Sequence, residues 1–144
     1  MPRKIAGFGE DGIQYTFSRK TFVAKPWTPV LRLLKENAET FLPDGQLYNY
    51  ALVNLYKDGT HSISPHKDDE KDLDPLSPIV SFSFGVERKI IFRRKGYKKI
   101  EINLEHGSTL VMKPPTNNFW THEIPKQKNV VDARINVTFR TILM

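Results

Sequence analysis

Three residues of this chain could together hold a metal ion: His66, Asp68 and the distant His122. Two imidazoles and one carboxylate form the facial triad that binds non-haem Fe(II) and leaves coordination positions open for an organic co-substrate and O2. On a strand, residues i and i+2 project to the same face, so His66 and Asp68 can reach one ion. The chain contains no cysteine, so its metal ligands must be nitrogen and oxygen atoms. These residue types and their spacing predict an iron site.

The pair of His66 and Asp68 is weak evidence by itself. A histidine two residues before an aspartate arises readily by chance, and residues 67–72 form a run of charges that a solvated turn would also contain. The solvated turn therefore stays open on this motif alone.

The segment Arg134–Arg140 strengthens the prediction of a site. Its alternation places Arg134, Asn136, Thr138 and Arg140 on one face of a strand and three apolar residues on the other. Two guanidinium groups on one face suit a small dicarboxylate such as 2-oxoglutarate, because arginine binds carboxylates through two parallel hydrogen bonds. An edge strand with a solvated polar face is the alternative.

The segment Asn54-Leu55-Tyr56 repeats this alternation on a smaller scale. It places an amide and a phenol on one face of a strand, with Leu55 opposite. Asn54 and Tyr56 are therefore candidates for the same polar pocket.

A series of ordered motifs runs along nearly the whole chain: Pro2-Arg3-Lys4, Tyr15-Thr16-Phe17-Ser18, Lys25-Pro26-Trp27, Asn54-Leu55-Tyr56-Lys57-Asp58-Gly59, His66-Lys67-Asp68-Asp69-Glu70, Ser77-Pro78-Ile79, Ser81-Phe82-Ser83-Phe84-Gly85, His106-Gly107-Ser108, Pro115-Thr116-Asn117 and Arg134-Ile135-Asn136-Val137-Thr138-Phe139-Arg140. Together they resemble the AlkB family of Fe(II)- and 2-oxoglutarate-dependent nucleic-acid dealkylases. Within this family the chain looks closest to the AlkB homologue two type of DNA dealkylase. So many ordered matches are far more specific than the triad.

The resemblance implies His66, Asp68 and His122 as iron ligands. It implies a 2-oxoglutarate pocket with one arginine at each end of the co-substrate, formed by Asn54, Tyr56, Arg134, Asn136 and Arg140. Fe(II), 2-oxoglutarate and O2 would then yield succinate, CO2 and an oxidant that hydroxylates an N-methyl group, which leaves as formaldehyde. The implied function is oxidative demethylation of lesions such as 1-methyladenine and 3-methylcytosine in DNA.

The resemblance also implies a pocket for an extruded base, because a base inside a duplex cannot reach buried iron. Phe17, with Tyr15 on the same strand face, matches the family's stacking position, and His66 would close the other side. Asp69 and Glu70 match acidic positions near the damaged base, and their charge suits cationic lesions. A core strand rich in aromatic residues is the alternative for Tyr15 and Phe17.

Composition agrees with a compact enzyme that binds a polyanion. The chain has 144 residues, 39% of them hydrophobic, which is enough for one core, so we expect a single catalytic domain over residues 1–144. No apolar run could span a bilayer and no signal peptide is recognisable, so we expect a soluble, intracellular protein without membrane association. The resemblance adds a nuclear location. The net charge of +6 favours nucleic acid as the partner.

Basic residues crowd the stretch 88–99. We expect Arg93, Arg94 and Lys95, together with Arg3, to contact the nucleic-acid backbone. The tip of a solvated hairpin would have a similar composition.

One helix and many short strands are predicted. Thr28 is a plausible N-cap with Pro29 at the first helical position, and apolar residues recur at helical spacing to about Phe41. Six strands are expected, at 48–56, 79–84, 89–93, 99–103, 108–112 and 134–143. This order predicts a mainly β (α+β) fold, a double-stranded β-helix or jelly roll, with an N-terminal helix that buttresses one sheet.

The resemblance begins at Pro2, and the hairpin with which the family's relative wedges the duplex would precede it. We therefore expect this chain, acting as a monomer, to prefer single-stranded substrate. The alternatives are an RNA demethylase, a protein or small-molecule hydroxylase of the same superfamily, and a nucleic-acid binding module without catalysis.

Overall fold

The computed structural model describes residues 3–17 and 19–143, apart from the side chain of Phe17. Its helices are α1 (Pro29–Glu39) and α2 (Thr116–Phe119). Its strands are β1 (Lys4–Gly9), β2 (Gln14–Phe17), β3 (Lys20–Val23), β4 (Tyr50–Tyr56), β5 (Ile63–His66), β6 (Ile79–Gly85), β7 (Arg88–Arg93), β8 (Ile100–Leu104), β9 (Thr109–Met112), β10 (Thr121–Ile124) and β11 (Arg134–Arg140). Neither described helix is long and apolar enough to cross a membrane.

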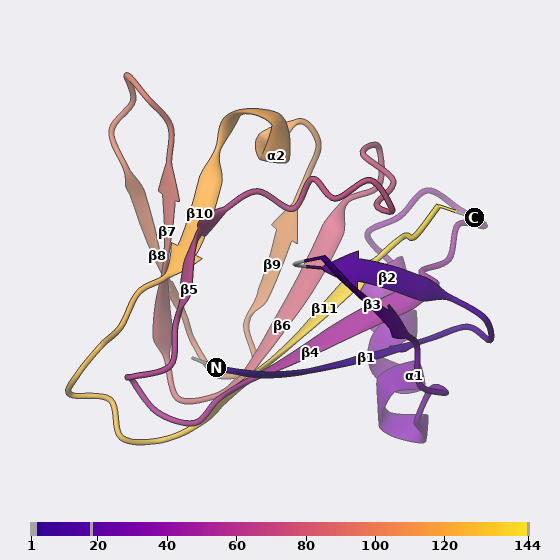
Figure 1. Ribbon diagram of the computed structural model, residues 1–144, viewed down its shortest axis with the longest axis horizontal. Coiled ribbons are helices and arrows are strands. Elements are labelled where there is room, and N and C mark those ends of the chain that lie inside the picture. Colours follow the sequence, from indigo (N-terminus) through magenta and orange to yellow (C-terminus); the bar gives the residue numbers. More distant parts are fainter. Residues whose placement is uncertain (1–2, 18, 144) are drawn as a thin grey trace.

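Two antiparallel sheets form the body of the molecule (Figure 1). The larger sheet has the order β1-β4-β11-β6-β9, the smaller one has the order β5-β10-β7-β8, and β2 and β3 make a separate hairpin. An apolar cluster joins the sheets, with Tyr56, Ile79 and Met112 from the larger one and Ile90 and Ile124 from the smaller one. The predicted double-stranded β-helix is confirmed.

Helix α1 lies against the outer face of the larger sheet (Figure 1). It begins as predicted, because the Thr28 hydroxyl accepts a hydrogen bond of 3.1 Å from the Leu31 amide and Pro29 follows the cap. Leu31 and Ala38 pack in one core cluster with Phe139 of β11. The predicted buttressing helix is therefore confirmed, and it ends at Glu39.

Strand β11 lies in the middle of the larger sheet, paired with β4 on one side and β6 on the other. Its polar row is buried: Arg134, Asn136, Thr138 and Arg140 are between 2% and 7% exposed. An edge strand would expose such a row to water, so that alternative is wrong. The polar row faces the space between the sheets and the apolar residues Val137 and Phe139 face α1.

Two strands that carry the candidate site are absent from the six predicted strands, although His66 and Asp68 were expected to share a strand. Strands β5 and β10 have four residues each, and β5 contains Pro65, which cannot donate to a ladder. Such short segments give no readable alternation. Pairing with neighbouring strands, and not local propensity, stabilises them.

Candidate functional site

The three predicted metal ligands meet between the sheets. Strands β5 and β10 pair antiparallel with His66 directly opposite His122, so the register brings the two imidazoles together. Asp68 lies two residues beyond the end of β5, in an extended segment and not on the strand as expected. Its Oδ1 is 3.5 Å from His66 Nε2 and its Oδ2 is 3.3 Å from His122 Nε2. One ligand atom from each residue lies within 4.8 Å of the others.

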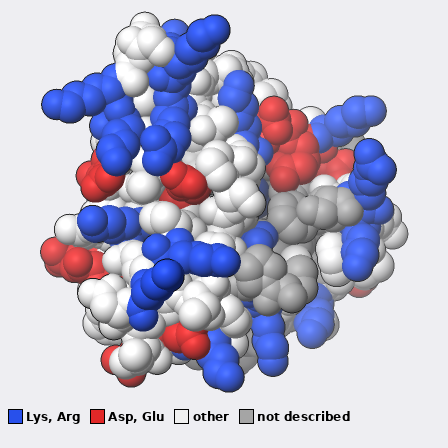
Figure 2. Space-filling model, turned by 60° about the vertical axis from the view of Figure 1, so that its left-hand side comes forward, with Lys and Arg blue, Asp and Glu red and all other residues white. Residues whose placement is uncertain are grey.

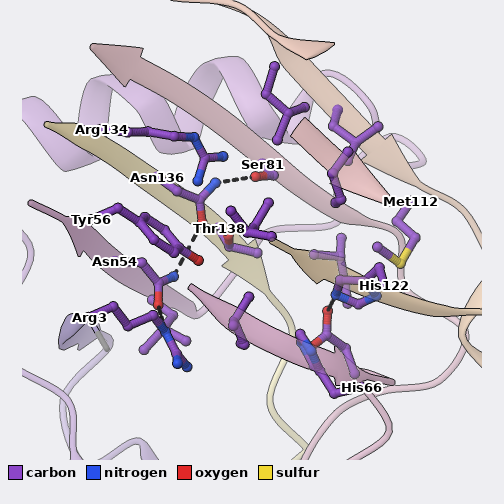
Figure 3. Close-up of a pocket in the computed structure, with 18 of the residues that line it drawn as sticks. Arg3, Asn54, Tyr56, His66, Ser81, Met112, His122, Arg134, Asn136 and Thr138 are labelled. Carbon is purple, nitrogen blue, oxygen red and sulfur yellow. Dashed lines mark hydrogen bonds and ion pairs between the residues drawn. The ribbon is translucent and has the colours of Figure 1, made fainter. Parts of the chain in front are cut away.

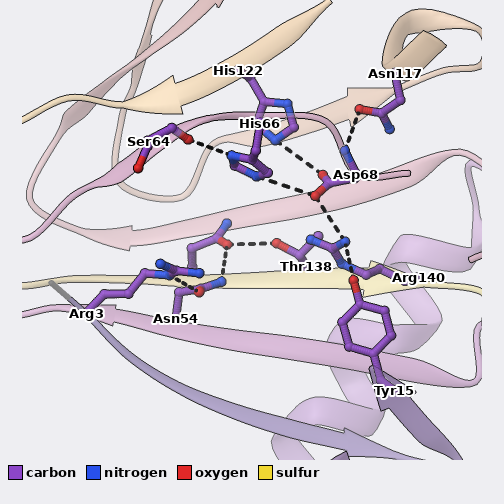
Figure 4. A network of polar contacts seen from close by, with 11 residues as sticks. Arg3, Tyr15, Asn54, Ser64, His66, Asp68, Asn117, His122, Thr138 and Arg140 are labelled. Atoms are coloured by element: carbon purple, nitrogen blue, oxygen red, sulfur yellow. Dashed lines mark hydrogen bonds and ion pairs between the residues drawn. The ribbon is translucent and has the colours of Figure 1, made fainter. Parts of the chain in front are cut away.

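Hydrogen bonds outside this triad fix the orientation of His66 and Asp68 (Figure 4), whereas His122 Nδ1 is buried without a hydrogen-bond partner among the described residues. His66 Nδ1 is 2.8 Å from the Ser64 carbonyl oxygen, which can only accept, and this contact directs Nε2 toward Asp68 and the metal position. The Asp68 amide donates to Asn117 Oδ1 over 3.2 Å, which ties the triad to α2. These contacts hold the ligands in place before a metal arrives.

Arg140 lies behind Asp68 and keeps it ionised. Arg140 Nη1 is 3.3 Å from Asp68 Oδ1 and donates over 3.3 Å to the Tyr15 hydroxyl. Burial raises the pKa of Asp68, but the charge of Arg140 and the hydrogen bonds from the two imidazoles outweigh burial and hold this pKa well below its usual value. Asp68 can therefore serve as the anionic ligand.

A cavity of ≈ 70 Å³ opens beside the triad and is lined by both arginines, Asn54, Tyr56 and Asn136 (Figure 3). Arg134 is directly opposite Tyr56 in the sheet, with its guanidinium carbon 5.2 Å from the centre of the Tyr56 ring. The five residues expected to bind 2-oxoglutarate thus line one space.

The two arginines differ in how their charge is balanced. Burial lowers the pKa of both guanidinium groups, but Asp68 more than offsets this for Arg140, whose pKa is raised, whereas the pKa of Arg134 stays lowered. Arg134 donates to Ser83 Oγ over 3.0 Å, while its Nε and Nη1 have no hydrogen-bond partner among the described residues. A buried cation with idle donors is costly unless an anion binds it.

Amide and hydroxyl groups cover the floor of the cavity between the arginines. Asn136 Oδ1 accepts from Asn54 over 3.2 Å and from Thr138 over 2.7 Å, and the Asn136 amide donates to Ser81. Arg3 Nε donates to Asn54 Oδ1 over 3.0 Å. This network fixes the side-chain amides in a low-dielectric space.

A second cavity, of ≈ 250 Å³, also has Asp68 in its lining and is acidic. Asp68, Asp69, Glu70 and Asp74 line it, together with Asn117 and apolar residues. Burial raises the pKa of Glu70, and its Oε2 is buried without a hydrogen-bond partner among the described residues. The cavity therefore suits a cationic or hydrogen-bond-donating group.

Two predicted substrate contacts need correction. Tyr15 is 1% exposed and packs against the Tyr50 ring at 5.1 Å, so it offers no open face to a base and supports Arg140 instead. Arg3 is 6% exposed and lines the co-substrate cavity, so it does not lie on the surface where a phosphate backbone would pass. Both side chains are drawn inward because β1 and β2 pack beside β4. The Phe17 side chain lies outside the described residues.

The other predicted backbone contacts lie at the end of the β7–β8 hairpin. Arg93 and Lys95 are exposed there, Arg94 is half-buried, and Arg93 pairs with Glu123 at 3.0 Å. Their arrangement around an open hollow is consistent with contact to a polyanion.

Sequence reasoning missed three supporting residues: Ser81 and Ser83 of β6, and Asn117. The two serines alternate with Val80, Phe82 and Phe84, so the period of two that exposed the polar row of β11 was also present here. Asn117 had no such signal, because it reaches Asp68 only through the tertiary fold.

The site fits Fe(II) and a dicarboxylate. Two imidazole nitrogens and one ionised carboxylate converge, and the donors of Arg134 without a partner among the described residues suit an anion in the same cavity. The donor set lacks thiolates, which agrees with an oxygen-activating non-haem iron and not with a structural zinc site.

Comparison with known proteins agrees with this geometry. The sequence profile of the 2OG-Fe(II) oxygenase superfamily matches residues 5–140. The chain is 45% identical to the DNA oxidative demethylase ALKBH2 of Mus musculus, over 99% of this chain and 63% of that protein. It is 37% identical to the alpha-ketoglutarate-dependent dioxygenase alkB homolog 3 of Homo sapiens, over 99% of this chain and 52% of that protein. The chain thus spans less than two thirds of the length of these relatives.

A solved structure described as "The structure of OsALKBH1" superposes with a TM-score of 0.69 at 16% identity, over 98% of this chain and 79% of that one. It supports the fold alone. The resemblance to AlkB proteins is confirmed by the sequence matches, and the chain belongs to the 2OG-Fe(II) oxygenase superfamily.

Proposed function

We propose that this chain is an Fe(II)- and 2-oxoglutarate-dependent enzyme that demethylates N-alkylated bases in DNA. The observation that carries the proposal is the position of Asp68, which lines both cavities. The cavity with the two arginines would take the dicarboxylate, and the acidic cavity that shares Asp68 with it would take the base. A metal held by His66, Asp68 and His122 would therefore lie between co-substrate and lesion.

The two arginines divide the co-substrate between them. Arg140 contacts Asp68 at 3.3 Å, so it would meet the carboxylate nearer the metal. Arg134, with its idle Nε and Nη1, would meet the far carboxylate, and the Tyr56 phenol beside it would add a donor.

The acidic cavity matches the charge of the lesion. Methylation at N1 of adenine or N3 of cytosine makes the base cationic, and Asp69 and Glu70 would stabilise it by charge, while a neutral base gains less. The proposed partner for these lesions is DNA, as the printed names of the relatives suggest.

The chemistry needs little from the protein beyond positioning. With iron bound, 2-oxoglutarate and O2 would supply an oxidant: 2-oxoglutarate would lose CO2, one oxygen atom of O2 would end in succinate, and the other would hydroxylate the N-methyl carbon. The hydroxymethyl base then releases formaldehyde. The residues of the chain orient the two reactants on either side of Asp68, and no side chain needs to act as a nucleophile.

The proposal extends to the domain, the oligomeric state, the preferred form of DNA and the location of the protein. Residues 1–144 form one catalytic domain. The active unit is a monomer, because one chain contributes all three ligands and both arginines. Single-stranded DNA is preferred to duplex, because an unpaired base reaches the acidic cavity without the cost of extrusion. A DNA substrate makes the nucleus the expected location.

The test is a direct assay. The protein is loaded anaerobically with Fe(II), then given 2-oxoglutarate, O2 and an oligonucleotide with one 1-methyladenine, as single-stranded DNA, duplex DNA and RNA. We expect equal amounts of succinate, formaldehyde and repaired base above the uncoupled background, with the highest rate on single-stranded DNA.

Three outcomes would contradict the proposal. Succinate without formaldehyde or repaired base on any nucleic acid would indicate a hydroxylase with another substrate. Binding of the oligonucleotide without succinate would indicate a module that lacks turnover. A higher rate on RNA than on DNA would replace the proposed substrate.

A further inference from the structure

Two exposed aromatic rings flank an arginine beside the candidate site. Tyr97, at the turn of the β7–β8 hairpin, is 57% exposed, and Phe119, at the end of α2, is 50% exposed. The guanidinium carbon of Arg94 is 4.2 Å from the centre of the Tyr97 ring and 4.6 Å from that of Phe119. We call Arg94, Tyr97 and Phe119 the ring platform.

Backbone contacts hold the ring platform in shape. The Tyr97 amide donates to the Arg94 carbonyl over 3.0 Å, and Gly96 between them adopts a φ of 84° that glycine tolerates without strain. On the other side the Trp120 amide, next to Phe119, donates to Thr116 over 2.9 Å. The rings therefore belong to two ordered turns and are displayed to solvent by them.

The hollow beside the ring platform is basic. Its volume is ≈ 620 Å³, and Lys67, Arg93, Lys95 and Lys99 line it with the platform and Thr121, so none of its described lining residues is acidic. Glu123 and Glu101 pair with Arg93 and Lys99, whereas no carboxylate forms an ion pair with Arg94 or Lys95 in the described part of the chain. Figure 2 shows lysine and arginine side chains crowding the hairpin end at the top of the molecule.

Lys67 and α2 connect the hollow to the candidate active site. Lys67 lies between the ligands His66 and Asp68 in the sequence, lines the hollow, and donates from Nζ to the Asn118 carbonyl over 3.2 Å. Asn117 of the same short helix accepts from the Asp68 amide. A strand of nucleic acid with one base in the acidic cavity would therefore pass next to the ring platform.

We propose that the ring platform binds the unpaired base beside the lesion by stacking, while the lysines of the hollow hold its phosphate. This inference rests on the proposed function. Exposed aromatic rings within a basic groove are the arrangement by which proteins bind single-stranded nucleic acid without reading its sequence. Arg94 packs on both rings and Trp120 packs against Tyr97 at 5.7 Å, so a base would stack on the ring surface that remains exposed. An acidic peptide would use the charges but not this aromatic surface. A fully paired duplex buries the faces of its bases and cannot stack on them.

The test is a double-mutant cycle in which an aromatic ring is removed from the protein and the neighbouring base is removed from the oligonucleotide, separately and together. Binding of a single-stranded oligonucleotide with one 1-methyladenine is measured by fluorescence anisotropy at fixed salt, for the unaltered protein and for Tyr97→Ala and Phe119→Ala. A second pair of oligonucleotides carries an abasic residue on the 5′ or the 3′ side of the lesion. Tyr97→Phe keeps the ring, and Phe41→Ala removes an aromatic side chain that is 48% exposed and does not line the hollow.

We expect Phe119→Ala or Tyr97→Ala to weaken binding by about 5- to 150-fold, the usual effect of losing a stacking ring. Tyr97→Phe and Phe41→Ala should bind as the unaltered protein does. One of the two abasic oligonucleotides should bind the unaltered protein more weakly by a similar factor. The alanine variants should bind this oligonucleotide nearly as tightly as they bind the one without an abasic residue.

The ring platform is refuted if both alanine variants bind the single-stranded oligonucleotide normally, or if the abasic residue weakens every protein equally. An equal loss on blunt duplex would also refute it, because paired bases cannot stack on the rings. Demethylation is assayed separately on the same oligonucleotides. If the binding results are as expected but no methyl group is removed, the ring platform is supported and the proposed function is contradicted. If the protein demethylates the oligonucleotides but the binding results are not as expected, the proposed function is supported and the ring platform is contradicted.

Discussion

Replacing Arg134 by methionine separates a ligand-binding arginine from a structural one. The guanidinium is 2% exposed, burial lowers its pKa, and Nε and Nη1 have no hydrogen-bond partner among the described residues. Without 2-oxoglutarate this cation is desolvated and poorly compensated. Methionine fills a similar volume without charge, so the ligand-free variant should be as stable as the unaltered protein or more stable.

The effect on 2-oxoglutarate should be large. Losing one partner of a buried, hydrogen-bonded charge pair costs about 2–5 kcal/mol. This corresponds to a dissociation constant about 30- to 5,000-fold higher. Arg134→Lys keeps the charge but loses the planar guanidinium, so its dissociation constant for 2-oxoglutarate should lie between those of the unaltered protein and Arg134→Met.

Two measurements test this prediction. Isothermal titration under anaerobic conditions gives the dissociation constant of 2-oxoglutarate with Fe(II) present, and thermal unfolding with and without 2-oxoglutarate gives the stabilisation by the ligand. Arg32→Ala, on the exposed face of α1, is the control for a lost positive charge. Unchanged 2-oxoglutarate affinity together with a strongly lowered midpoint of the ligand-free variant would show that Arg134 is structural, and the reasoning would be wrong.

Three other predictions follow from the same structure. Asp68→Asn should abolish tight Fe(II) binding in an anaerobic titration and abolish demethylation, because the site loses its only anionic ligand; normal iron affinity would contradict the triad. Burial lowers the pKa of His66, but the hydrogen bond and charge of Asp68 outweigh burial and raise this pKa. Protons then compete with iron for His66, so iron affinity should fall as the pH drops through this pKa. An iron affinity that does not change between about pH 8 and 5 would contradict this prediction. Thr28→Ala should lower the free energy of unfolding by about 1 kcal/mol in a urea titration, since Thr28 caps α1, and no change would argue against the cap.

Local periodicity in the sequence was enough to predict much of the site. Alternation in Arg134–Arg140 identified which residues share a face, and the same alternation paired Asn54 with Tyr56. The cap at Thr28 fixed the start of α1. These features are local because side-chain direction repeats every two residues in a strand and capping involves one turn of helix.

Tertiary structure decided which of these faces is buried and which distant residues meet. Nothing local indicates that β11 is a central strand, that β10 pairs with β5 so that His122 faces His66, or that Tyr15 turns into the core behind Arg140. Each depends on pairing between segments far apart in the chain, whose free energy comes from packing and from shared hydrogen bonds and not from the residues' own propensities.

The ring platform illustrates the same limit most clearly. Arg94 and Tyr97 belong to the β7–β8 hairpin, and Phe119 belongs to a helix of four residues that follows one further strand, β9. As sequence, the basic stretch was indistinguishable from a solvated hairpin tip. The residue types were fixed by the sequence, but their common surface exists only because the smaller sheet holds β7 beside β10 and so brings the hairpin and α2 together.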